Sequence, residues 1–442
     1  MHFCRFFDAL LMTSVEKNLI GLCGNYLFYQ ALITKSPKKM KIGLIREGKT
    51  PPDNRVALTP QQCAFTERLY PIKIIVEPST IRSFTDAEFE EEDVKTSYNL
   101  QSCDYLLGIK EVPIANLIPH KTYFFFSHTI KKQVHNRPLL QAVLEKKITL
   151  IDYEVLTDDY GQRLIAFGKF AGMVGAHNGM LAHGVRTGVY TLPRMKDLES
   201  YADARAIYKT IKLPPLSIVV SGSGRVAKGA MEVLHDWGVQ QVEPAEYLTE
   251  KFDVPVFTQI HPENYAEHLD NQAFVKQDYY KDPSRFKSTF SKFYKKTDIF
   301  INCIFYDKRA PQFFTLEDMQ QPDFKIQTIA DVSCDMMPFS SVPSTIKTTT
   351  IAEPFYGFNP FNNSETKNPF DTEGVTMMTI DNLPNELPRD ASEYFGEQFI
   401  INIIPELQNL MRGRKSKVLE RATIAKEGKL TPRFEYLQDY VQ

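Results

Sequence analysis

Three side chains that can take up or release a proton each follow a short apolar run in the first half of the chain. They are Lys110, His128 and Glu154. The apolar runs are separated by helical patterns, which predicts parallel strands of an α/β sheet. Because ligands bind outside the carboxyl ends of such strands, we expect the three side chains to meet at one edge of the sheet. A single Lys, His or Glu at a strand end is more often only solvated, so the repetition is what favours a catalytic site.

A second pattern, around Gly222 and Gly224, could bind a phosphate. The two glycines follow a β-branched run (218–220), and from Ala227 onward apolar residues recur at the spacing of a helix face. A strand, a glycine turn and a helix in this order are the context of a dinucleotide-binding fingerprint. Gly222 permits the tight turn, Gly224 lets the backbone approach a pyrophosphate, and Ala227 allows close packing. The start of the helix would hold the anion, because its N–H groups and dipole favour negative charge.

An acidic residue usually meets the ribose hydroxyls of such a cofactor about twenty residues after the glycines. Glu243, at the end of a short predicted strand (239–243), has this spacing. Glu246 is a competing candidate. Because Pro244 lies between them, the segment could equally be an ordinary helix start. The sequence leaves this choice open.

The elements that carry these residues predict an α/β fold with two Rossmann-like domains, each with a parallel sheet, and a cleft between them. A substrate-binding and catalytic domain is expected over residues 40–168. A C-terminal segment (385–442) is expected to return to this domain and complete it. Residues 169–384 are expected to form the dinucleotide-binding domain.

Four further segments carry expectations. A helix should begin at Thr59-Pro60, since Pro is tolerated at the first helical position. The small-residue stretch 166–190 predicts a closely packed helix that acts as a hinge between the domains. Residues 250–295 are interpreted as a polar, aromatic-rich insertion that widens the nucleotide domain, and residues 339–372 as a loop-rich segment.

Composition and charge exclude several classes of protein. A chain of 442 residues is expected to form two or three domains, and 43% hydrophobic with 24% charged residues is typical of a soluble globular protein. A net charge of −2 provides no basic field for nucleic acid or for an anionic membrane surface. No apolar run is long enough for a membrane span. The six cysteines form no C-x-x-C pair, which argues against structural zinc and a disulfide scaffold and favours a reduced, cytoplasmic compartment.

Residues 1–39 are predicted to be a loose extension or a misassigned start. Their apolar stretch is broken by Glu16 and Lys17 before a signal-peptide core is complete, and a small-residue cleavage site is hard to find. A clean strand pattern starts at Met40, which we therefore expect to be the working N-terminus.

Seven short stretches resemble the lysine-forming saccharopine dehydrogenases and the lysine–ketoglutarate reductase domain. They are residues 55–60, 108–113, 126–131, 166–168, 301–304, 331–333 and 380–384. The stretches occur in the same order as in that family, and the resemblance covers residues 40–442. More distantly, the chain is similar to alanine dehydrogenase and to the nucleotide domain of transhydrogenase.

The resemblance implies a nicotinamide-dependent oxidoreductase acting on CH–NH donors, which interconverts saccharopine with L-lysine and 2-oxoglutarate. By matching motif, Lys110 and His128 would be the acid–base pair, and Glu154 would tune Lys110. Arg55 and Arg163 would hold substrate carboxylates, although Gln162 stands where the fungal enzymes have a second Arg. Cofactor contacts would come from Gly222, Gly224, Arg225, Val226, Glu243, Cys303, Asp381 and Leu383. The cofactor would be NAD or NADP, because the ribose segment differs from the fungal pattern.

The residue types suit this chemistry. Saccharopine carries three carboxylates, which the guanidinium forks of Arg bind in a planar, bidentate way. Its secondary amine must lose a proton before hydride leaves, and water must then add to the imine. Both steps need groups that titrate near neutrality, such as a His, or a Lys whose pKa is shifted by its neighbours.

Two alternatives remain. An alanine dehydrogenase-like enzyme with a smaller substrate would keep Lys110 and His128 but need fewer Arg contacts. A non-catalytic nucleotide sensor would keep the glycine turn and lose the strand-end residues. In every case we expect small-molecule partners, neither nucleic acid nor membrane, no metal site, and a monomer or small homo-oligomer. The sequence leaves the physiological direction of the reaction open.

Overall fold

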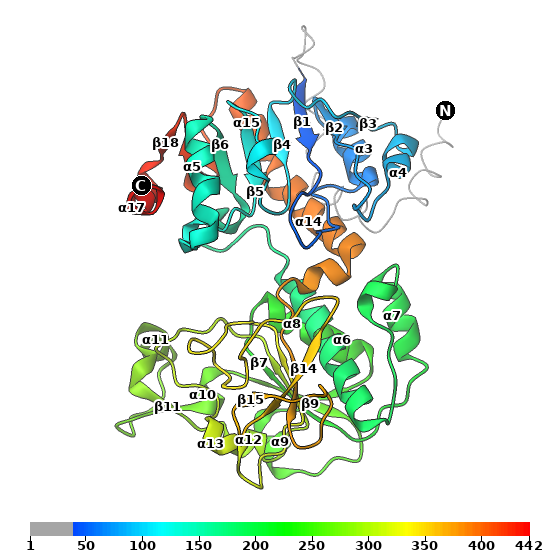
Figure 1. The fold of residues 1–442 in the computed structure, drawn as a ribbon, viewed down its shortest axis with the longest axis vertical. Coiled ribbons are helices and arrows are strands. Elements are labelled where there is room, and N and C mark those ends of the chain that lie inside the picture. The colour runs from blue at the N-terminus through cyan, green and yellow to red at the C-terminus, as the bar shows by residue number, and fades with distance from the viewer. Residues whose placement is uncertain (1–38) are drawn as a thin grey trace, which may run out of the picture. The chain divides into compact units, whose positions relative to one another are not determined.

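The computed structural model describes residues 39–442, which divide into two compact units (Figure 1). Unit 1 comprises the described residues up to Ala166 together with Ala391–Gln442, and unit 2 comprises Phe167–Asp390. Each unit has its own eight-stranded sheet. The predicted α/β fold, with two Rossmann-like, largely parallel sheets and a C-terminal segment that returns to the first, is confirmed. The extension expected over residues 1–39 lies, apart from Lys39, outside the described residues.

The sheet of unit 1 has the strand order β18-β17-β6-β5-β4-β1-β2-β3. Its strands are β1 (Met40–Leu44), β2 (Ile72–Val76), β3 (Lys95–Thr96), β4 (Tyr105–Leu107), β5 (Thr122–Phe125), β6 (Thr149–Asp152), β17 (Thr423–Lys426) and β18 (Lys429–Leu430). Strands β1 to β6 run parallel to one another, whereas β17 and β18 form an antiparallel hairpin beside β6. From β3 the chain crosses back to β4 on the other side of β1. The switch point, where sheets of this kind bind ligands, therefore lies between β1 and β4.

The first helix of unit 1, α3 (Pro60–Leu69), begins at the predicted Thr59-Pro60. Thr59 Oγ1 accepts a hydrogen bond from the Gln62 N–H at 3.3 Å, and Gln62 Oε1 accepts one from the Thr59 N–H at 3.0 Å. This capping box satisfies two N–H groups that lack a partner within the helix. The other helices are α4 (Asp86–Glu91), α5 (Arg137–Glu145), α14 (Pro388–Asn402), α15 (Ile404–Met411), α16 (Lys417–Ala422) and α17 (Gln438–Val441), with short 3-10 helices η3 (Ile114–Asn116), η4 (Thr129–Lys131), η5 (Val134–Asn136), η6 (Tyr153–Val155) and η10 (Pro432–Leu437).

The sheet of unit 2 has the strand order β15-β14-β16-β13-β12-β7-β9-β8. Its strands are β7 (Ser217–Ser221), β8 (Gln240–Gln241), β9 (Val256–Ile260), β12 (Ile299–Asn302), β13 (Thr328–Asp331), β14 (Phe355–Asn359), β15 (Ser364–Glu365) and β16 (Val375–Met378). A separate antiparallel pair is formed by β10 (Ala266–His268) and β11 (Phe286–Ser288). Six neighbouring strands run parallel to one another, in the order β8, β9, β7, β12, β13 and β16, and β14 and β15 add an antiparallel edge beside β16.

The interpretation of residues 250–295 as an insertion is wrong. They contain β9, which pairs in parallel with β7 from Ser217↔Val256 to Ser221↔Ile260. Strand β8 pairs with β9 and so lies one strand farther from β7. Similarly, the segment 339–372 contributes β14 and β15 and is not only a loop. Partners in a sheet are chosen by long-range packing, which the local pattern of apolar residues does not report.

Helix α6 (Gly168–Thr187) packs along α8 (Arg225–Asp236) in unit 2 (Figure 1). A Cβ at Gly172 would come within 1.8 Å of the Val226 carbonyl oxygen, so only glycine allows this approach. The predicted close packing is confirmed, and the hinge function stays a prediction. The other helices of unit 2 are α7 (Tyr201–Tyr208), α9 (Pro244–Thr249), α10 (Pro262–Tyr265), α11 (Lys276–Lys281), α12 (Ser291–Tyr294) and α13 (Leu316–Met319), with 3-10 helices η7 (Met195–Asp197), η8 (Pro283–Arg285) and η9 (Leu383–Glu386).

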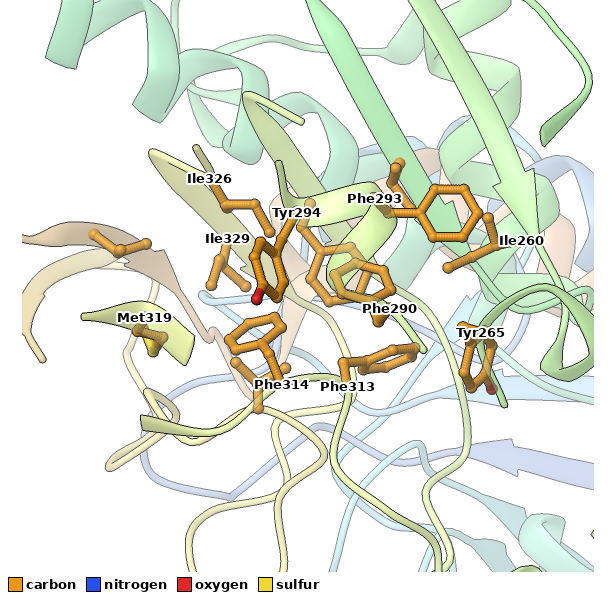
Figure 2. Packing of buried hydrophobic residues seen from close by; sticks show 14 of the residues in the cluster. Ile260, Tyr265, Phe290, Phe293, Tyr294, Phe313, Phe314, Met319, Ile326 and Ile329 are labelled. Atoms are coloured by element: carbon orange, nitrogen blue, oxygen red, sulfur yellow. The ribbon is translucent and has the colours of Figure 1, made fainter. Parts of the chain in front are cut away.

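Aromatic side chains fill a hydrophobic cluster of unit 2 (Figure 2). Phe290 and Phe293 come from the segment that we expected to be an insertion, yet both are fully buried. The ring centroid of Phe290 lies 5.0 Å from that of Phe300 on β12 and 5.1 Å from that of Phe313. Tilted aromatic pairs at this spacing stabilise a core beyond the area they bury. The segment 250–295 thus supplies part of the core of unit 2.

No helix between residues 39 and 442 is both long enough and apolar enough to cross a membrane. Within the same range, no three His, Cys, Asp or Glu side chains lie close enough together to hold a metal ion.

Candidate active site

Lys110, His128 and Glu154 lie just beyond the carboxyl ends of β4, β5 and β6. These three strands are neighbours in the sheet of unit 1 and run parallel to one another. The three side chains therefore follow successive strands at the same edge, beside the switch point. Their roles in a reaction remain predictions.

Lys110 has the electrostatic surroundings of a proton-transfer group. Burial, with the nearby positive charges of Arg55 and Lys49, lowers the pKa of Lys110 to about 8, against the opposing charges of Asp53 and Glu111. Within residues 39–442, no carboxylate lies within ion-pair distance of the Lys110 ammonium. A lysine held in this way can be neutral near physiological pH and so act as a base.

His128 is held by a carboxylate that sequence reasoning missed. Its Nδ1 lies 2.6 Å from Glu111 Oε1, and Glu111 Oε2 lies 3.4 Å from Lys49 Nζ. Burial raises the pKa of Glu111, but the hydrogen bond and charge of His128 outweigh it and lower that pKa to about 2. With Nδ1 bonded to a carboxylate, Nε2 is the nitrogen that can exchange a proton with a substrate. The sequence signal for Glu111 was its place next to Lys110 in a family motif.

Glu154 faces two cations of its own unit. Its Oε1 lies 3.3 Å from Arg163 Nη2 and 3.6 Å from Lys131 Nζ. Its Oε2 is buried and has no hydrogen-bond partner among the described residues. The structure thus pairs Glu154 with Arg163 and Lys131, and Glu154 is not among the charges that chiefly shift the pKa of Lys110.

The two arginines predicted to bind substrate carboxylates have different surroundings. Arg55 is 3% exposed and makes a two-point contact with Asp53, with Nε to Oδ1 at 2.9 Å and Nη2 to Oδ2 at 2.5 Å. Arg163 lies near Glu154, and 42% of its side chain is exposed. Arg163 is therefore the more accessible of the two, whereas binding by Arg55 would have to compete with a buried ion pair.

Glu47 is a second carboxylate that sequence reasoning missed. It follows β1, and its side chain accepts hydrogen bonds from the backbone N–H groups of Ile109 at 2.6 Å and Lys110 at 2.9 Å. Burial, reinforced by the negative charge of Asp53, raises the pKa of Glu47 to about 8. The logic that selected the residues after β4, β5 and β6 applies to it as well, because β1 ends at the same edge.

The glycine turn of unit 2 has the geometry expected of a phosphate-binding turn. Gly222 has φ +91°, and a Cβ there would lie 3.0 Å from the Cys303 carbonyl oxygen. Gly224 precedes α8 and provides no side-chain cap, and a Cβ at Gly224 would point into open space. A helix of 12 residues with an uncapped, accessible start is well suited to an anion.

A cavity of about 380 Å³ opens beside this turn. Its lining includes Gly222, Gly224, Cys303, His261, Tyr265, Tyr279, Tyr280, Phe305, Tyr306 and Asp307. Three of the predicted cofactor residues, Gly222, Gly224 and Cys303, are among them. Of the others, Arg225 and Val226 begin α8, Asp381 follows β16, and Leu383 is buried in η9.

Glu243, the predicted ribose ligand, does not line this cavity. It caps α9, with Pro244 at the first helical position and Glu246 in the first turn, so the segment is an ordinary helix start. The strand beside β7 is β9, and the residue that follows it is His261. His261 lines the cavity beside Gly222 and Gly224, and the ribose role of Glu243 stays a prediction.

Polar side chains join the ends of the three central strands of unit 2. Ser221 Oγ donates to Asn302 Oδ1 at 2.9 Å, and Asn302 Nδ2 donates to Asp331 Oδ1 at 2.8 Å. Ser221 Oγ also accepts a hydrogen bond from the Cys303 N–H at 3.1 Å. All three side chains are fully buried. This network fixes the spacing of β7, β12 and β13 where the glycine turn begins.

Comparison with known sequences identifies relatives. Residues 43–174 match the family described as alanine dehydrogenase/PNT, N-terminal domain. Alpha-aminoadipic semialdehyde synthase of Arabidopsis thaliana is 31% identical over 90% of this chain and 41% of that protein, and the mouse mitochondrial synthase is 28% identical over 90% and 48%. The chain thus spans less than half the length of these synthases. The NAD⁺-dependent, L-lysine-forming saccharopine dehydrogenase of Emericella nidulans is 27% identical over 86% of this chain and 95% of that enzyme.

Solved structures share the fold. L-alanine dehydrogenase superposes with a TM-score of 0.62 at 15% identity, covering 91% of this chain and all of that one. A transhydrogenase from Sinorhizobium meliloti gives 0.52 at 12% identity, covering 88% and 98%. The resemblance seen in the seven short stretches is confirmed. This chain is a homologue of the L-lysine-forming saccharopine dehydrogenases, and its residues 43–174 resemble the N-terminal domain of the alanine dehydrogenase/PNT family.

Proposed function

We propose that this chain is an oxidoreductase that uses a nicotinamide cofactor to interconvert saccharopine with L-lysine and 2-oxoglutarate. The observation that carries the proposal is the pair of Lys110 and His128 after neighbouring strands. The pKa of Lys110 is lowered to about 8 by burial, and His128 is held by Glu111. The homologous saccharopine dehydrogenases support this choice of substrate.

The glycine turn of unit 2 fits the cofactor. The positive φ of Gly222 and the side-chain-free start of α8 at Gly224 leave room for a pyrophosphate against the helix N-terminus. When bound there, the cofactor would supply the hydride acceptor for oxidation of the carbon next to the secondary amine of saccharopine. Asp381 and Leu383 are proposed to lie near the nicotinamide, and Cys303 near the turn.

The acid–base steps fall to unit 1. Neutral Lys110 takes the proton from the secondary amine, which prepares the neighbouring carbon for hydride loss. His128 then passes protons through Nε2 as water adds to the imine and the carbinolamine collapses to lysine and 2-oxoglutarate. Glu111 holds the His128 ring in the tautomer that these transfers need. Glu154 orients Arg163, and Arg163 and Arg55 contact substrate carboxylates.

The proposal extends to NADP(H) as the preferred cofactor. An acidic residue after the strand that lies next to β7 in the sheet would bind the ribose hydroxyls of NAD and repel a 2′-phosphate. At that position this chain has His261. Among the described residues that line the cavity, the one carboxylate is Asp307, and its Oδ2 lies 2.6 Å from Arg309 Nη2. The site therefore lacks a carboxylate that is available to the ribose.

A spectrophotometric assay tests the function. Oxidation of NADPH, and more slowly of NADH, should require lysine and 2-oxoglutarate together. Pyruvate with ammonia is the matched control, because it reports the alanine dehydrogenase-like alternative. Turnover with pyruvate and ammonia but not with lysine and 2-oxoglutarate would replace the proposal by that alternative, and cofactor binding without any turnover would favour a nucleotide sensor.

A further inference from the structure

Strands β1 and β4 pair in parallel across the switch point of unit 1, from Ile42↔Tyr105 to Leu44↔Leu107. Beyond this pairing, the Ile45 N–H donates to the Leu107 carbonyl at 2.9 Å. The segments that follow β1 and β4 therefore leave the sheet side by side. Glu47 and Lys110 therefore lie on adjacent chain segments, each a few residues past its own strand.

After Gly108, the N–H groups of the segment that carries Lys110 no longer donate to backbone carbonyls, while the Ile109 carbonyl still accepts a hydrogen bond from the Phe126 N–H at 2.9 Å. The Gly108 N–H still donates to the Phe124 carbonyl at 2.9 Å, but the next two N–H groups donate to Glu47 instead. Glu47 Oε1 accepts from Ile109 at 2.6 Å, and Oε2 accepts from Lys110 at 2.9 Å. One carboxylate thus continues the hydrogen bonding of the sheet by two residues and fixes the backbone at Lys110.

Gly48 and Lys49, the two residues after Glu47, also contact the segment 109–113. A Cβ at Gly48 would lie 2.6 Å from Pro113 Cγ, so the backbone at Gly48 packs closely against the proline ring. Lys49 Nζ lies 3.4 Å from Glu111 Oε2, and Glu111 holds His128. Each residue of the segment 47–49 therefore contacts the segment 109–113, which carries Lys110 and Glu111.

We infer that Glu47 is a positioning residue, whose carboxylate sets the backbone from which Lys110 and Glu111 project. The inference rests on the proposed function for its catalytic consequence. Since the Lys110 ammonium has no ion-pair partner among residues 39–442, the direction of its side chain depends on this backbone and on packing. A misplacement of about 1 Å in a reacting group can lower a rate about a hundredfold.

The test compares Glu47→Gln with Glu77→Gln. Glu77 is a matched control, because its Oε2 accepts the Arg46 N–H at 3.0 Å after the neighbouring strand, away from Lys110. In Glu47→Gln, one N–H of the segment faces the amide NH₂, donor against donor. Above pH 8, where Glu47 with its raised pKa of about 8 is mostly ionised, we expect Glu47→Gln to give faster amide hydrogen exchange at Ile109 and Lys110 and a fall in kcat of about ten- to a hundredfold. The KM for the dinucleotide and the melting temperature should match those of Glu77→Gln.

Two further variants make the result decisive. Glu47→Asp keeps a carboxylate and should retain more activity than Glu47→Gln. Gly48→Ala should produce the same two effects by pushing the segments apart with the carboxylate in place, and it serves if Glu47→Gln does not fold. Exchange at Ile109 and Lys110 equal to that of the control, or a loss of stability with unchanged kcat, would overturn the inference. If the unmodified chain shows no turnover, the proposed function is rejected. The positioning role of Glu47 is then still tested by hydrogen exchange at Ile109 and Lys110, because that measurement does not require activity.

Discussion

Lys110 and Glu47 in unit 1 owe their shifted pKa values to burial more than to single partners. Burial is the largest cause of the lowered pKa of Lys110 and of the raised pKa of Glu47, and both values come to about 8. A lysine and a glutamate with ordinary pKa values of 10.5 and 4.5 thus titrate together. Such convergence is found where enzymes tune acid–base groups to neutral pH.

The rate of saccharopine oxidation should rise with pH and level off above about 8. The pKa of Lys110 is lowered, so its neutral, basic form gains population as pH increases through that value. A pH profile of kcat/KM for saccharopine checks this. Lys110→Met should abolish the rising limb, whereas Glu47→Gln should keep it. If only Glu47→Gln lost the rising part of the pH profile, the titration would be assigned to the carboxyl group of Glu47.

Removing His128 should slow turnover without weakening cofactor binding. His128→Gln cannot pass protons during imine hydration, which lowers kcat by about 10²–10⁴-fold, the usual range for a positioned acid–base group. The double variant with Lys110→Met should fall by much less than the product of the single effects, because groups that act together are not additive. Nucleotide binding followed by fluorescence is the control. Near-normal rates in both single variants would leave two solvated strand-end residues.

The two arginines should respond differently to replacement. Arg163→Met removes an accessible guanidinium, and a lost charged hydrogen bond of about 1.5–3 kcal/mol raises the substrate KM about ten- to a hundredfold. Arg55→Met removes a buried two-point ion pair with Asp53 together with the proposed substrate contact, so we expect a raised substrate KM and also a free energy of unfolding that is lower by about 3–5 kcal/mol. Steady-state kinetics and thermal unfolding of both variants separate the effects. Unchanged KM in Arg163→Met would remove it from the substrate site.

At the scale of elements, the order of strands decides which residue meets the cofactor. Glu243 has the sequence spacing of a ribose ligand, yet β9 lies between β8 and β7. The residue after β9 is His261, and it lines the cavity beside the glycine turn. Because β9 lies between β8 and β7, a histidine and not an acidic residue lies beside the glycine turn, which is the basis of the proposed preference for NADP(H).

Cofactor preference should therefore shift in His261→Asp. A carboxylate there can accept hydrogen bonds from the ribose hydroxyls and repels a 2′-phosphate. We expect the ratio of kcat/KM for NADPH over NADH to fall by at least about tenfold, the equivalent of 1.4 kcal/mol. Glu243→Gln is the control and should leave the ratio unchanged. A shift in Glu243→Gln instead would return the ribose position to the predicted residue.

At the scale of the whole molecule, each unit has its own sheet and its own hydrophobic cluster. The C-terminal segment completes unit 1, since β17 pairs with β6. In unit 2 the aromatic cluster includes residues from the stretch between β8 and β12, which joins the sheet and also packs on it.

Phe290→Ala should destabilise unit 2 by about 3–5 kcal/mol, the usual range for removing a buried phenylalanine. Phe290 is fully buried among aromatic rings, whereas Phe361 is 71% exposed. Phe361→Ala is therefore the matched control, with a change of at most about 0.5 kcal/mol. Denaturant unfolding measures both. A small effect of Phe290→Ala would show that neighbouring side chains of the cluster can move into the space left by the removed ring.

The sequence by itself determined the elements whose signals are local. The capping box at Thr59, the glycine turn at Gly222 and the strand ends before Lys110, His128 and Glu154 all lie where the pattern predicts. Each depends on residues within a few positions of one another, so backbone preference and spacing suffice.

Only the tertiary structure decided which elements and side chains meet. The pairing of β9 with β7, the hydrogen bonds from Glu47 to the Lys110 segment and the contact of Asp53 with Arg55 were not apparent in the sequence. Strand order is set by packing between distant parts of the chain, and the pKa values follow from the burial that this packing produces. A local pattern contains neither, which is why it could not predict that β9 lies between β7 and the strand that precedes Glu243.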